Sequence, residues 1–469
     1  MYGGYKYIEE SYEPKKDEFK LLVWVKGKKR FEELAEGVAA ESSVGTWTKI
    51  STMNKKVFKD YRARIYRIKK VSESSGFVWI SYPYEHFDER NLLQFYASVF
   101  GNVYGLKELE ELYMIDLYIP LRYQRLYDGP KFGLEGIRRI VGTHKTRRPH
   151  VGTIVKPKVG LTPAEFAKVA YDAWVNGLDL VKDDENLVNQ KFCGWKERFD
   201  KTNQARDKAE TKTGEVKLYA TNITDMDRHK MYERIDYVAE SGNKLVMMDV
   251  FIMGFALVKE MVEYAHKKGL AVHAHRAGYA ALHRSGFGYD FRILSKFYRL
   301  LGVDQLHIGT GVGKMEGNPY YIKKLHDVMV KEELEEEKFL GFFKQEWDED
   351  IKAVFPVASG GLDAGKVEGI VAVHGKDVVI QAGGGVHGHP KGSKAGAKSM
   401  RQAVEAVARN IALDVAAKQA KELKQALEYF GYIRKEEVER KIKEIKESSS
   451  LLEEMVYDKG LNFLVALRD

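Results

Sequence analysis

Eight short apolar runs occupy the chain from residue 150 to about residue 410, and amphipathic segments alternate with them. These segments lie near residues 162–174, 225–241, 256–268, 290–301, 318–332, 364–373 and 395–410. A connection long enough to hold a helix returns the chain so that the next strand lies parallel to the previous one. The number of repeats and their total length match a closed (β/α)8 TIM barrel. An open, doubly wound sheet is the alternative, but no Gly-x-Gly-x-x-Gly motif follows the first run. The sequence therefore favours a barrel, with strands expected at 151–155, 178–181, 216–220, 245–250, 270–275, 305–308, 353–358 and 378–381.

The chain on either side of these repeats has a different character. Residues 19–25 and 76–82 are apolar enough for strands, whereas 31–40 and 91–100 carry apolar residues at helical spacing. Strands and helices without strict alternation predict an N-terminal α+β domain over residues 1–145, ahead of a barrel domain over 146–410.

Residues 411–469 are rich in charged residues at helical spacing and predict a helical C-terminal extension. Its helices are expected at 424–430, 436–446 and 451–468, with a break at the serines 448–450. We expect this extension to pack against the barrel or against a partner subunit.

Composition narrows the class of protein. No apolar stretch approaches the ~18 residues of a membrane-spanning helix, so we expect no membrane segment. The only cysteine, Cys193, lies beside Phe192 and Trp195, which favours a packing role over a nucleophilic one and fits a cytoplasmic protein. The net charge is +8, but lysines and acids are interspersed along the chain. That pattern indicates solvated helix faces and not a nucleic-acid-binding stripe.

Polar residues or glycines follow every predicted barrel strand. In this fold the chemistry belongs at the carboxyl ends of the strands, which meet on one face. Each of these residues alone fits an ordinary turn, but together they indicate a shared site. They are Lys156, Lys158, Lys182, Asp183, Asp184, Glu185, Asn222, Asp249, His273, His275, Arg276, His307, Lys314, Ser359, Gly360, Gly361, Gly383, Gly384 and Gly385.

The second strand ends in one lysine and three consecutive acids. Buried charges need partners, and the carboxylates of Asp184 and Glu185 would bind a hard divalent cation. An ammonium cannot ligate a metal, but Lys182 would become a third oxygen ligand if its amine reacted with CO2 to form a carbamate. A charged surface turn is the alternative for this stretch alone. The other strand ends favour the metal site.

The last two strands run into glycines, where exposed backbone N–H groups form the usual phosphate site of this barrel. Arg276, His307 and Ser359 would bind a second phosphate. Two phosphate sites with a cation between them indicate a sugar bisphosphate, whose enediolate form the cation would stabilise. Lys156 would move protons, and Lys314, which follows Gly313, would sit on a closing lid.

At these residues the chain resembles a known family, the large subunit of ribulose-1,5-bisphosphate carboxylase/oxygenase (RuBisCO). The resemblance covers about residues 5–430. The amino-acid sequence at residues 181–187 and 221–224 is most similar to the archaeal type called form III. The motifs that carry it are 39–48, 156–158, 177–186, 275–277, 307–317, 359–361 and 381–390.

The resemblance implies an activity and its cofactors. A member of this family joins CO2 to ribulose 1,5-bisphosphate to give two molecules of 3-phosphoglycerate, with O2 competing, by way of an enediolate held at Mg2+. Form III members serve the salvage of AMP and other nucleotides. The resemblance also implies a homodimer with shared active sites, which can assemble further, and no small subunit.

The resemblance also assigns roles to residues of this sequence. Carbamylated Lys182 (N6-carboxylysine), Asp184 and Glu185 would bind Mg2+. Lys156, Lys182, His275 and Lys314 would be catalytic. Substrate binding would fall to Lys158, Arg276, His307, Ser359, Gly360, Gly361, Gly383 and Gly384, together with Glu41, Thr46, Trp47 and Asn102 of the neighbouring subunit.

Two positions depart from the plant-type pattern. Ile154 stands where those enzymes have a substrate-contacting threonine, and Thr153, one residue away, would face the other side of the strand. Tyr279 replaces a histidine after the His-Arg motif. Both changes bear on rate and on CO2/O2 selectivity, and neither touches the metal ligands.

Two other functions compete with carboxylation. A RuBisCO-like enolase or isomerase would act on a ketose phosphate without fixing CO2, but such relatives lose parts of the lid and phosphate pattern that this chain retains. A non-catalytic structural or nucleic-acid-binding protein would explain the basic charge, but it would not require polar groups at eight strand ends. The sequence therefore favours the carboxylase.

Overall fold

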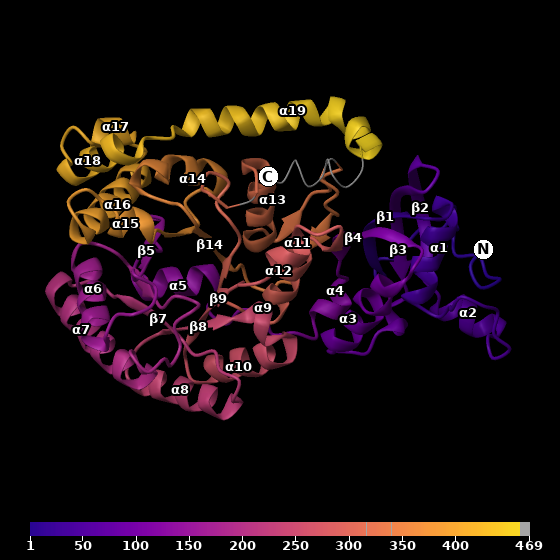
Figure 1. Ribbon diagram of the computed structural model, residues 1–469, viewed down its shortest axis with the longest axis horizontal. Coiled ribbons are helices and arrows are strands. Elements are labelled where there is room, and N and C mark those ends of the chain that lie inside the picture. The colour runs from indigo at the N-terminus through magenta and orange to yellow at the C-terminus, as the bar shows by residue number, and fades with distance from the viewer. Residues whose placement is uncertain (316, 339, 460–469) are drawn as a thin grey trace.

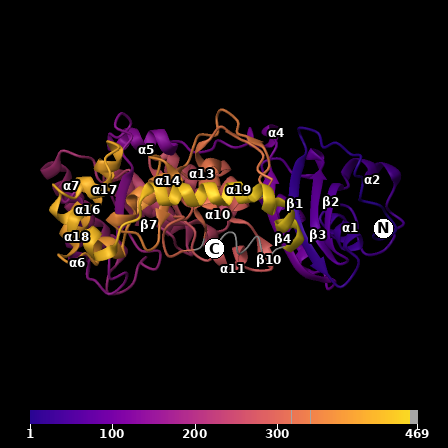
Figure 2. The same ribbon diagram turned by 90° about the horizontal axis from the view of Figure 1, so that it is seen from above.

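The computed structural model describes residues 1–315, 317–338 and 340–459. It shows an N-terminal domain beside a closed barrel, with helices of the C-terminal segment lying along the barrel (Figure 1; Figure 2). The predicted fold class is confirmed: a (β/α)8 barrel joined to an N-terminal α+β domain. Among the described residues, the helices are too short or too polar to cross a bilayer.

A five-stranded sheet forms the centre of the N-terminal domain, with the order β10-β4-β1-β3-β2. Its strands are β1 (Phe19–Gly27), β2 (Arg64–Ser72), β3 (Ser75–Tyr82), β4 (Leu109–Tyr118) and β10 (Phe287–Tyr289). Neighbouring pairs are antiparallel except β10, which comes from within the barrel sequence and joins β4 in parallel. The helices of this part are α1 (Phe31–Glu41), α2 (Lys55–Tyr61), α3 (Leu92–Phe100), α4 (Leu121–Gln124), η1 (Tyr84–His86) and η2 (Asn102–Gly105).

The barrel closes with eight parallel strands in the described part of the chain. The last strand pairs with the first through Val379 and His150, and all eight overlap the runs expected from the sequence. They are β5 (His150–Ile154), β6 (Leu180–Lys182), β7 (Leu218–Asn222), β8 (Leu245–Asp249), β9 (Ala271–His275), β11 (Gln305–His307), β14 (Phe355–Ser359) and β15 (Val379–Gln381).

Apolar residues that open the strands fill the amino end of the barrel. Leu180, Leu218 and Phe355 form one buried cluster with Leu134 and Ile137 of α5 (Gly133–Val141). Because these strand residues come first in their strands, α5 covers the amino end. The opposite, carboxyl end, called here the mouth, is left for polar side chains.

One long helix follows each barrel strand. The helices are α6 (Pro163–Val175), α7 (Trp195–Thr213), α8 (Arg228–Glu240), α10 (Phe255–Lys267), α12 (Phe291–Leu300), α13 (Pro319–Val330), α14 (Val367–His374) and α16 (Ser393–Ala408). Shorter elements lie between them: α9 (Val250–Met253), α11 (Ala280–His283), α15 (Gly384–His387), η3 (Ala364–Lys366), β12 (Glu333–Leu334) and β13 (Gln345–Glu346).

Helix α7 has no counterpart among the segments expected from the sequence. Its buried face mixes apolar residues such as Trp195 and Phe199 with polar ones such as Arg198, so the apolar stripe in its sequence is interrupted. By contrast, α6 begins with a capping box, in which the side chains of Thr162 and Glu165 each accept a hydrogen bond from the backbone N–H of the other. Cys193, just before α7, is buried, and burial raises the pKa of its thiol, which supports the predicted packing role.

The C-terminal segment forms α17 (Leu413–Ala416), α18 (Lys421–Phe430) and α19 (Lys435–Lys459). The predicted break at the serines 448–450 is wrong, because α19 is continuous through them. Serine lowers helix stability only slightly relative to alanine, and neither glycine nor proline interrupts this stretch. The last part of the helix expected at 451–468 lies outside the described residues. Helix α19 lies along α13 and α14 and reaches β2.

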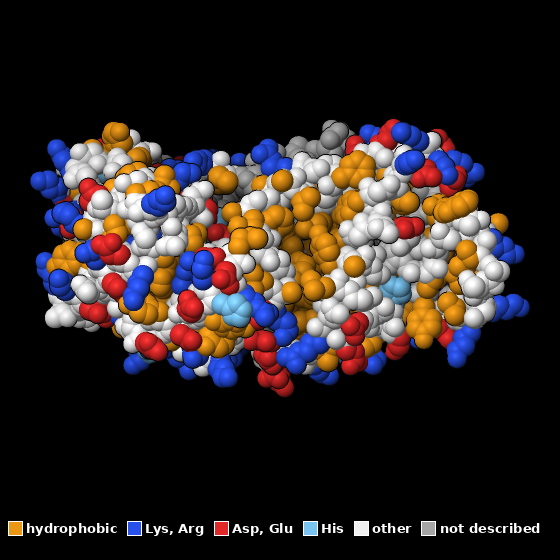
Figure 3. All heavy atoms as spheres, turned by 60° about the horizontal axis from the view of Figure 1, so that its bottom comes forward, with side chains coloured by type: hydrophobic (Ala, Val, Ile, Leu, Met, Phe, Trp, Pro, Cys, Tyr) orange, Lys and Arg blue, Asp and Glu red, His pale blue; other side chains and the backbone are white. Residues whose placement is uncertain are grey.

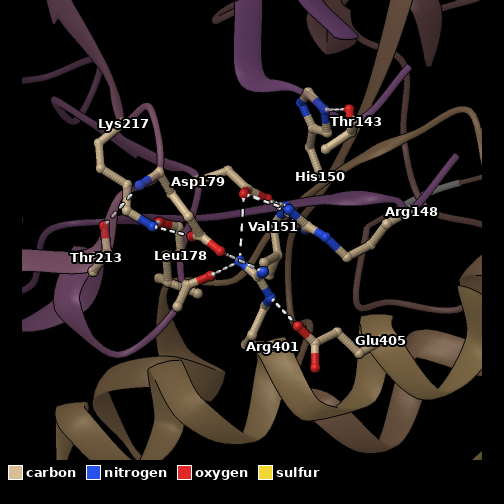
Figure 4. A network of polar contacts seen from close by, with 12 residues as sticks. Thr143, Arg148, His150, Val151, Leu178, Asp179, Thr213, Lys217, Arg401 and Glu405 are labelled. Carbon is tan, nitrogen blue, oxygen red and sulfur yellow. Dashed lines mark hydrogen bonds and ion pairs between the residues drawn. The ribbon is translucent and has the colours of Figure 1, made fainter. Parts of the chain in front are cut away.

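Charged side chains at the amino end of the barrel form a network centred on Asp179 (Figure 4). Asp179 is 1% exposed and accepts hydrogen bonds from both terminal nitrogens of Arg148 at 2.7 and 2.8 Å and from the Val151 N–H at 2.9 Å. Arg401 lies 3.8 Å from Asp179 and pairs with further acids of the network at 2.7 Å. We call this the amino-end network: Arg148, Asp179, Glu215, Lys217, Arg401 and Glu405.

Candidate active site

Lys182 ends β6 and lies at the mouth with 1% of its surface exposed. Its amine donates to the backbone oxygen of Asp183 at 2.7 Å and lies 3.4 Å from the sulfur of Met247. The nearest carboxylate oxygen, on Glu185, is 3.7 Å away. An ammonium has three N–H donors, so this buried amine is poorly satisfied by its neighbours.

Asp184 is buried and directly contacts Lys156, which lies in the loop after β5. Lys156 Nζ lies 2.7 Å from one carboxylate oxygen, and the side-chain amide of Asn186 donates to the other at 2.8 Å. Burial alone would raise the pKa of Asp184, but these hydrogen bonds outweigh burial and lower it. Asp184 is therefore a carboxylate at neutral pH. Lys158, two residues after Lys156, is exposed.

His275 connects two carboxylates at the mouth. Its Nδ1 lies 3.0 Å from Asp249, and its Nε2 lies 3.6 Å from Glu185. Burial raises the pKa of Glu185, but the nearby charges of Lys182 and His275 outweigh burial and lower it. Because Asp249 accepts a hydrogen bond from Nδ1, Nε2 is the ring nitrogen of His275 that faces Glu185 and the site.

Asp183, the middle acid of the motif, points away from the mouth. It is 0% exposed and accepts hydrogen bonds from the hydroxyl of Tyr219 at 2.7 Å, from Arg198 at 3.1 Å and from the Asn222 N–H at 2.8 Å. It therefore anchors β6 to β7 and α7. Alternation of side chains along an extended segment is the sequence signal that separates Asp183 from Lys182 and Asp184.

Arg276, His307 and Ser359 come from three neighbouring strands, but only two of them are in direct contact. His307 Nδ1 lies 2.8 Å from the Ser359 hydroxyl. The guanidinium of Arg276 lies over the rings of Tyr279 at 3.9 Å and Phe291 at 4.2 Å. Tyr279, one of the two departures noted in the sequence, thus supports an arginine.

The loop after β11 brings Lys314 onto the glycines that follow β14. The Lys314 N–H donates to the Gly360 carbonyl at 3.3 Å. A Cβ atom at Gly361 would lie 2.8 Å from Cγ of Lys314, and the φ of Gly361 is +70°. A side chain at this position would therefore push the loop away. Lys314 itself is exposed.

Gly383 and Gly384 end the loop after β15 and begin α15. A Cβ atom on Gly383 would lie 3.1 Å from Cε of Lys156, whereas Gly384 faces open space. Ile154, the other departure, has its Cδ1 3.8 Å from the same Cβ position. The hydroxyl of Thr153 instead donates to the Ala382 carbonyl at 2.9 Å. Thr153 therefore faces the other side of the strand from Ile154, as the alternation along the strand predicted.

The N-terminal residues of the predicted site do not join the mouth within one chain. Glu41 ends α1, which lies on the side of its domain away from the barrel (Figure 1). Trp47 is 77% exposed, and Asn102 lies in η2 and is also exposed. No contact within the described residues links them or Thr46 to the barrel residues of the site.

The described residues include no group of three histidine, cysteine, aspartate or glutamate side chains arranged to hold a metal ion. The predicted ligand set is of another kind, because its third member is a modified lysine. The polar residues of β6, β8 and β9 nevertheless converge at one mouth. Asp183 was predicted to lie at this mouth but turns away from it, whereas Gln305 is a buried residue of the region that the sequence prediction left out.

Two family models match the chain. The N-terminal domain of the ribulose bisphosphate carboxylase large chain matches residues 6–123, and its catalytic domain matches residues 135–430. The chain belongs to the RuBisCO large-chain family. The predicted resemblance and the predicted enzyme class are therefore confirmed.

Relatives of this RuBisCO chain cover most of its length. The ribulose bisphosphate carboxylase of Methanocaldococcus jannaschii is 45% identical over 429 residues, which are 90% of this chain and 99% of that protein. The dimeric archaeal Rubisco from Hyperthermus butylicus has a TM-score of 0.84 and 38% identity, covering 91% of this chain and 99% of that one. The octameric Rubisco of Pyrococcus horikoshii has a TM-score of 0.82 and 39% identity, covering 91% and 96%. The likeness to archaeal RuBisCO is confirmed.

Proposed function

We propose that this chain catalyses the carboxylation of ribulose 1,5-bisphosphate by CO2 to two molecules of 3-phosphoglycerate, with O2 as a competing substrate. The observation that carries the proposal is the mouth itself, where the amine of Lys182, two ionised carboxylates and Lys156 lie in one cluster. Family membership supports the same activity.

We propose Mg2+ as the cofactor and Lys182 as a lysine carbamate. The donor set fits: the 3.7 Å between the Lys182 amine and Glu185 leaves room beside a nitrogen whose partners are one carbonyl oxygen and one sulfur. With a carbamate, Lys182, Asp184 and Glu185 would offer only oxygen ligands, which Mg2+ prefers. When bound, the ion would supply positive charge for the oxygens of the sugar.

The chain's own residues would hold the protons. Lys156 approaches Asp184 at 2.7 Å and Gly383 from the other side, so its amine can serve as acid and base at C2 of the sugar. The Lys182 carbamate would take the proton from C3. His275, held by Asp249 at its Nδ1, presents Nε2 for a second proton transfer.

The two phosphates would bind on opposite sides of these residues. Backbone N–H groups at Gly361, Gly383 and Gly384 would hold one of them. Arg276, with His307 and Ser359 nearby, would hold the other side of the substrate. Lys314 would orient CO2 and the newly formed carboxylate when its loop closes over the substrate. Lys158 and Gly360 complete the proposed contacts.

A labelling experiment tests the reaction. The protein is incubated with Mg2+, labelled bicarbonate and ribulose 1,5-bisphosphate, and the product is analysed for labelled 3-phosphoglycerate. Label in this product supports the proposal. Exchange of the C3 proton without label would instead show an enolase-type relative, and folded protein with neither activity would refute both.

We also propose a homodimer in which Glu41, Thr46, Trp47 and Asn102 complete the mouth of the partner. The 77% exposure of Trp47 supports this, because tryptophan is enriched in the interfaces between protein chains. Mixing Glu41→Gln and Lys182→Met chains under subunit exchange should restore about a quarter of the wild-type activity, since half of the sites in mixed dimers are intact. No recovery despite exchange would contradict shared sites. We also propose a role in the salvage of AMP and other nucleotides, which is the role that the resemblance to form III implies.

A further inference from the structure

Four side chains form a continuous hydrogen-bonded row from the barrel interior to the mouth. Oε1 of Gln305 lies 2.7 Å from Nδ1 of His273, and the Nε2 atoms of His273 and His307 lie 2.8 Å apart. His307 Nδ1 then lies 2.8 Å from the hydroxyl of Ser359. We call these four residues the relay. Gln305 and His273 are 0% exposed, so the row begins in the closed interior of the barrel.

Both imidazoles of the relay are neutral. Burial lowers the pKa of His273 to about 3, and burial together with neighbouring cations lowers the pKa of His307 well below its ordinary value. A neutral imidazole carries one N–H donor and one bare nitrogen. Each of the three hydrogen bonds therefore holds one proton, and the direction of one bond fixes the other two.

Only two arrangements of protons satisfy the row. In the inward arrangement, Ser359 donates to His307, His307 donates from Nε2 to His273, and His273 donates from Nδ1 to a carbonyl oxygen. In the outward arrangement, an amide N–H of Gln305 donates to His273 and every bond is reversed. The side-chain amide of Gln305 thus selects between them, according to whether its oxygen or its nitrogen faces His273.

We propose that Gln305 is a positioning residue that sets the inward arrangement and so presents Ser359 to the substrate as a hydrogen-bond acceptor. The amide oxygen faces His273, and Nε2 of Gln305 contacts no polar partner among the described residues. With its proton committed to His307, the Ser359 oxygen offers only lone pairs at the mouth. The substrate group that meets it must then be a hydroxyl and not a phosphate oxygen.

The proton arrangement is measurable without turnover. Protein labelled with 15N-histidine is sedimented and its imidazole nitrogens are recorded by solid-state NMR, with assignments from His273→Gln and His307→Gln. The inward arrangement requires a protonated Nδ1 on His273 and a protonated Nε2 on His307. The reverse pattern in the wild-type protein would overturn the proposal whether or not the chain fixes CO2.

Kinetics test the consequence for binding, which rests on the proposed carboxylation. Gln305→Met keeps the volume of the side chain and removes the acceptor. We expect its KM for ribulose 1,5-bisphosphate to rise about fivefold to tenfold, with a smaller change in kcat. The reason is that Ser359 would no longer be held as an acceptor for the substrate hydroxyl, and one such hydrogen bond contributes about 1 kcal/mol. Its NMR spectrum should show His307 in a mixture of both tautomers.

The matched control is Gln381→Met. Gln381 is another buried amide at a strand end of the same barrel, and both of its amide atoms lack polar partners among the described residues. This variant should keep the wild-type KM and tautomers. Equal changes in the two variants, or unchanged tautomers in Gln305→Met, would reduce Gln305 to a packing residue and overturn the proposal.

Discussion

Each end of strand β6 has a buried charged residue, but the two residues differ in how many hydrogen-bond partners they have. Asp179 at the amino end and Lys182 at the mouth are each 1% exposed. Asp179 receives two hydrogen bonds from Arg148 and one from the backbone, whereas Lys182 has one carbonyl oxygen, one sulfur and a carboxylate at 3.7 Å. The comparison separates charge that stabilises the fold from charge left available for a ligand, as expected for the two faces of this barrel.

Removing the mouth lysine should have the largest effect, and it should fall on activity alone. Lys182→Met keeps the length of the side chain but removes the amine. We expect carboxylation to fall by about 1000-fold or more, because the proposed third metal ligand is lost. The melting temperature should stay the same or rise, since a poorly satisfied buried amine is replaced by an apolar group. A large fall in melting temperature would mean that Lys182 is structural.

The reciprocal change at the amino end should affect stability instead. Asp179→Asn leaves the Arg148 guanidinium buried without its carboxylate, which costs about 3–5 kcal/mol for a broken buried pair. Denaturant unfolding measures this loss, and turnover per folded molecule should stay within about twofold of the wild type. Loss of turnover at unchanged stability would erase the distinction between the two ends.

Low pH should reduce the free energy of unfolding, because His150 at the amino end of the barrel is buried in its neutral form. Burial lowers the pKa of His150 to about 3, below the ~6.5 of an unfolded chain. The stability that this residue contributes is therefore complete above pH 6.5 and falls between there and pH 3, by at most about 1.4 kcal/mol per pH unit. His150→Gln, which retains a donor for Thr143, should flatten the dependence of unfolding free energy on pH. The exposed His229, changed to Gln, is the control and should leave the slope unchanged.

A change at Glu405, the exposed edge of the amino-end network, should have the smallest effect on the free energy of unfolding. Glu405 pairs with Arg401 at 2.7 Å, but its side chain is 41% exposed. Glu405→Gln should cost less than about 1 kcal/mol, because solvent screens this pair. A loss as large as that of Asp179→Asn would show that the network acts as a single unit.

Much of this fold could be predicted because the relevant signals are local. Apolar runs set the eight strands, and the polar residues after them placed Lys156, Asp184 and His275 at one mouth. Helix α7 was missed because polar side chains such as Arg198 occupy its buried face. The opposite orientations of Asp183 and Asp184, and the contact between Gln305 and His273, depend on pairing between strands that are distant in sequence. Residue order alone does not reveal such pairings.

Apolar side chains gather in the hollow between the two domains (Figure 3). A cavity of about 480 Å³ in this region is lined by Leu93 of α3 and Phe255 of α10. Together with the pairing of β10 and β4, this shared apolar boundary ties the two domains to each other.

The pairing of β10 with β4 has a consequence during synthesis. The ribosome completes β1 to β4 long before it reaches Phe287, so the nascent N-terminal sheet carries an open edge at β4 throughout that interval. Unpaired edges recruit other strands, and on polysomes the nearest are those of sister chains. The nascent first domain of this protein therefore exposes a strand edge that the finished fold covers with β10.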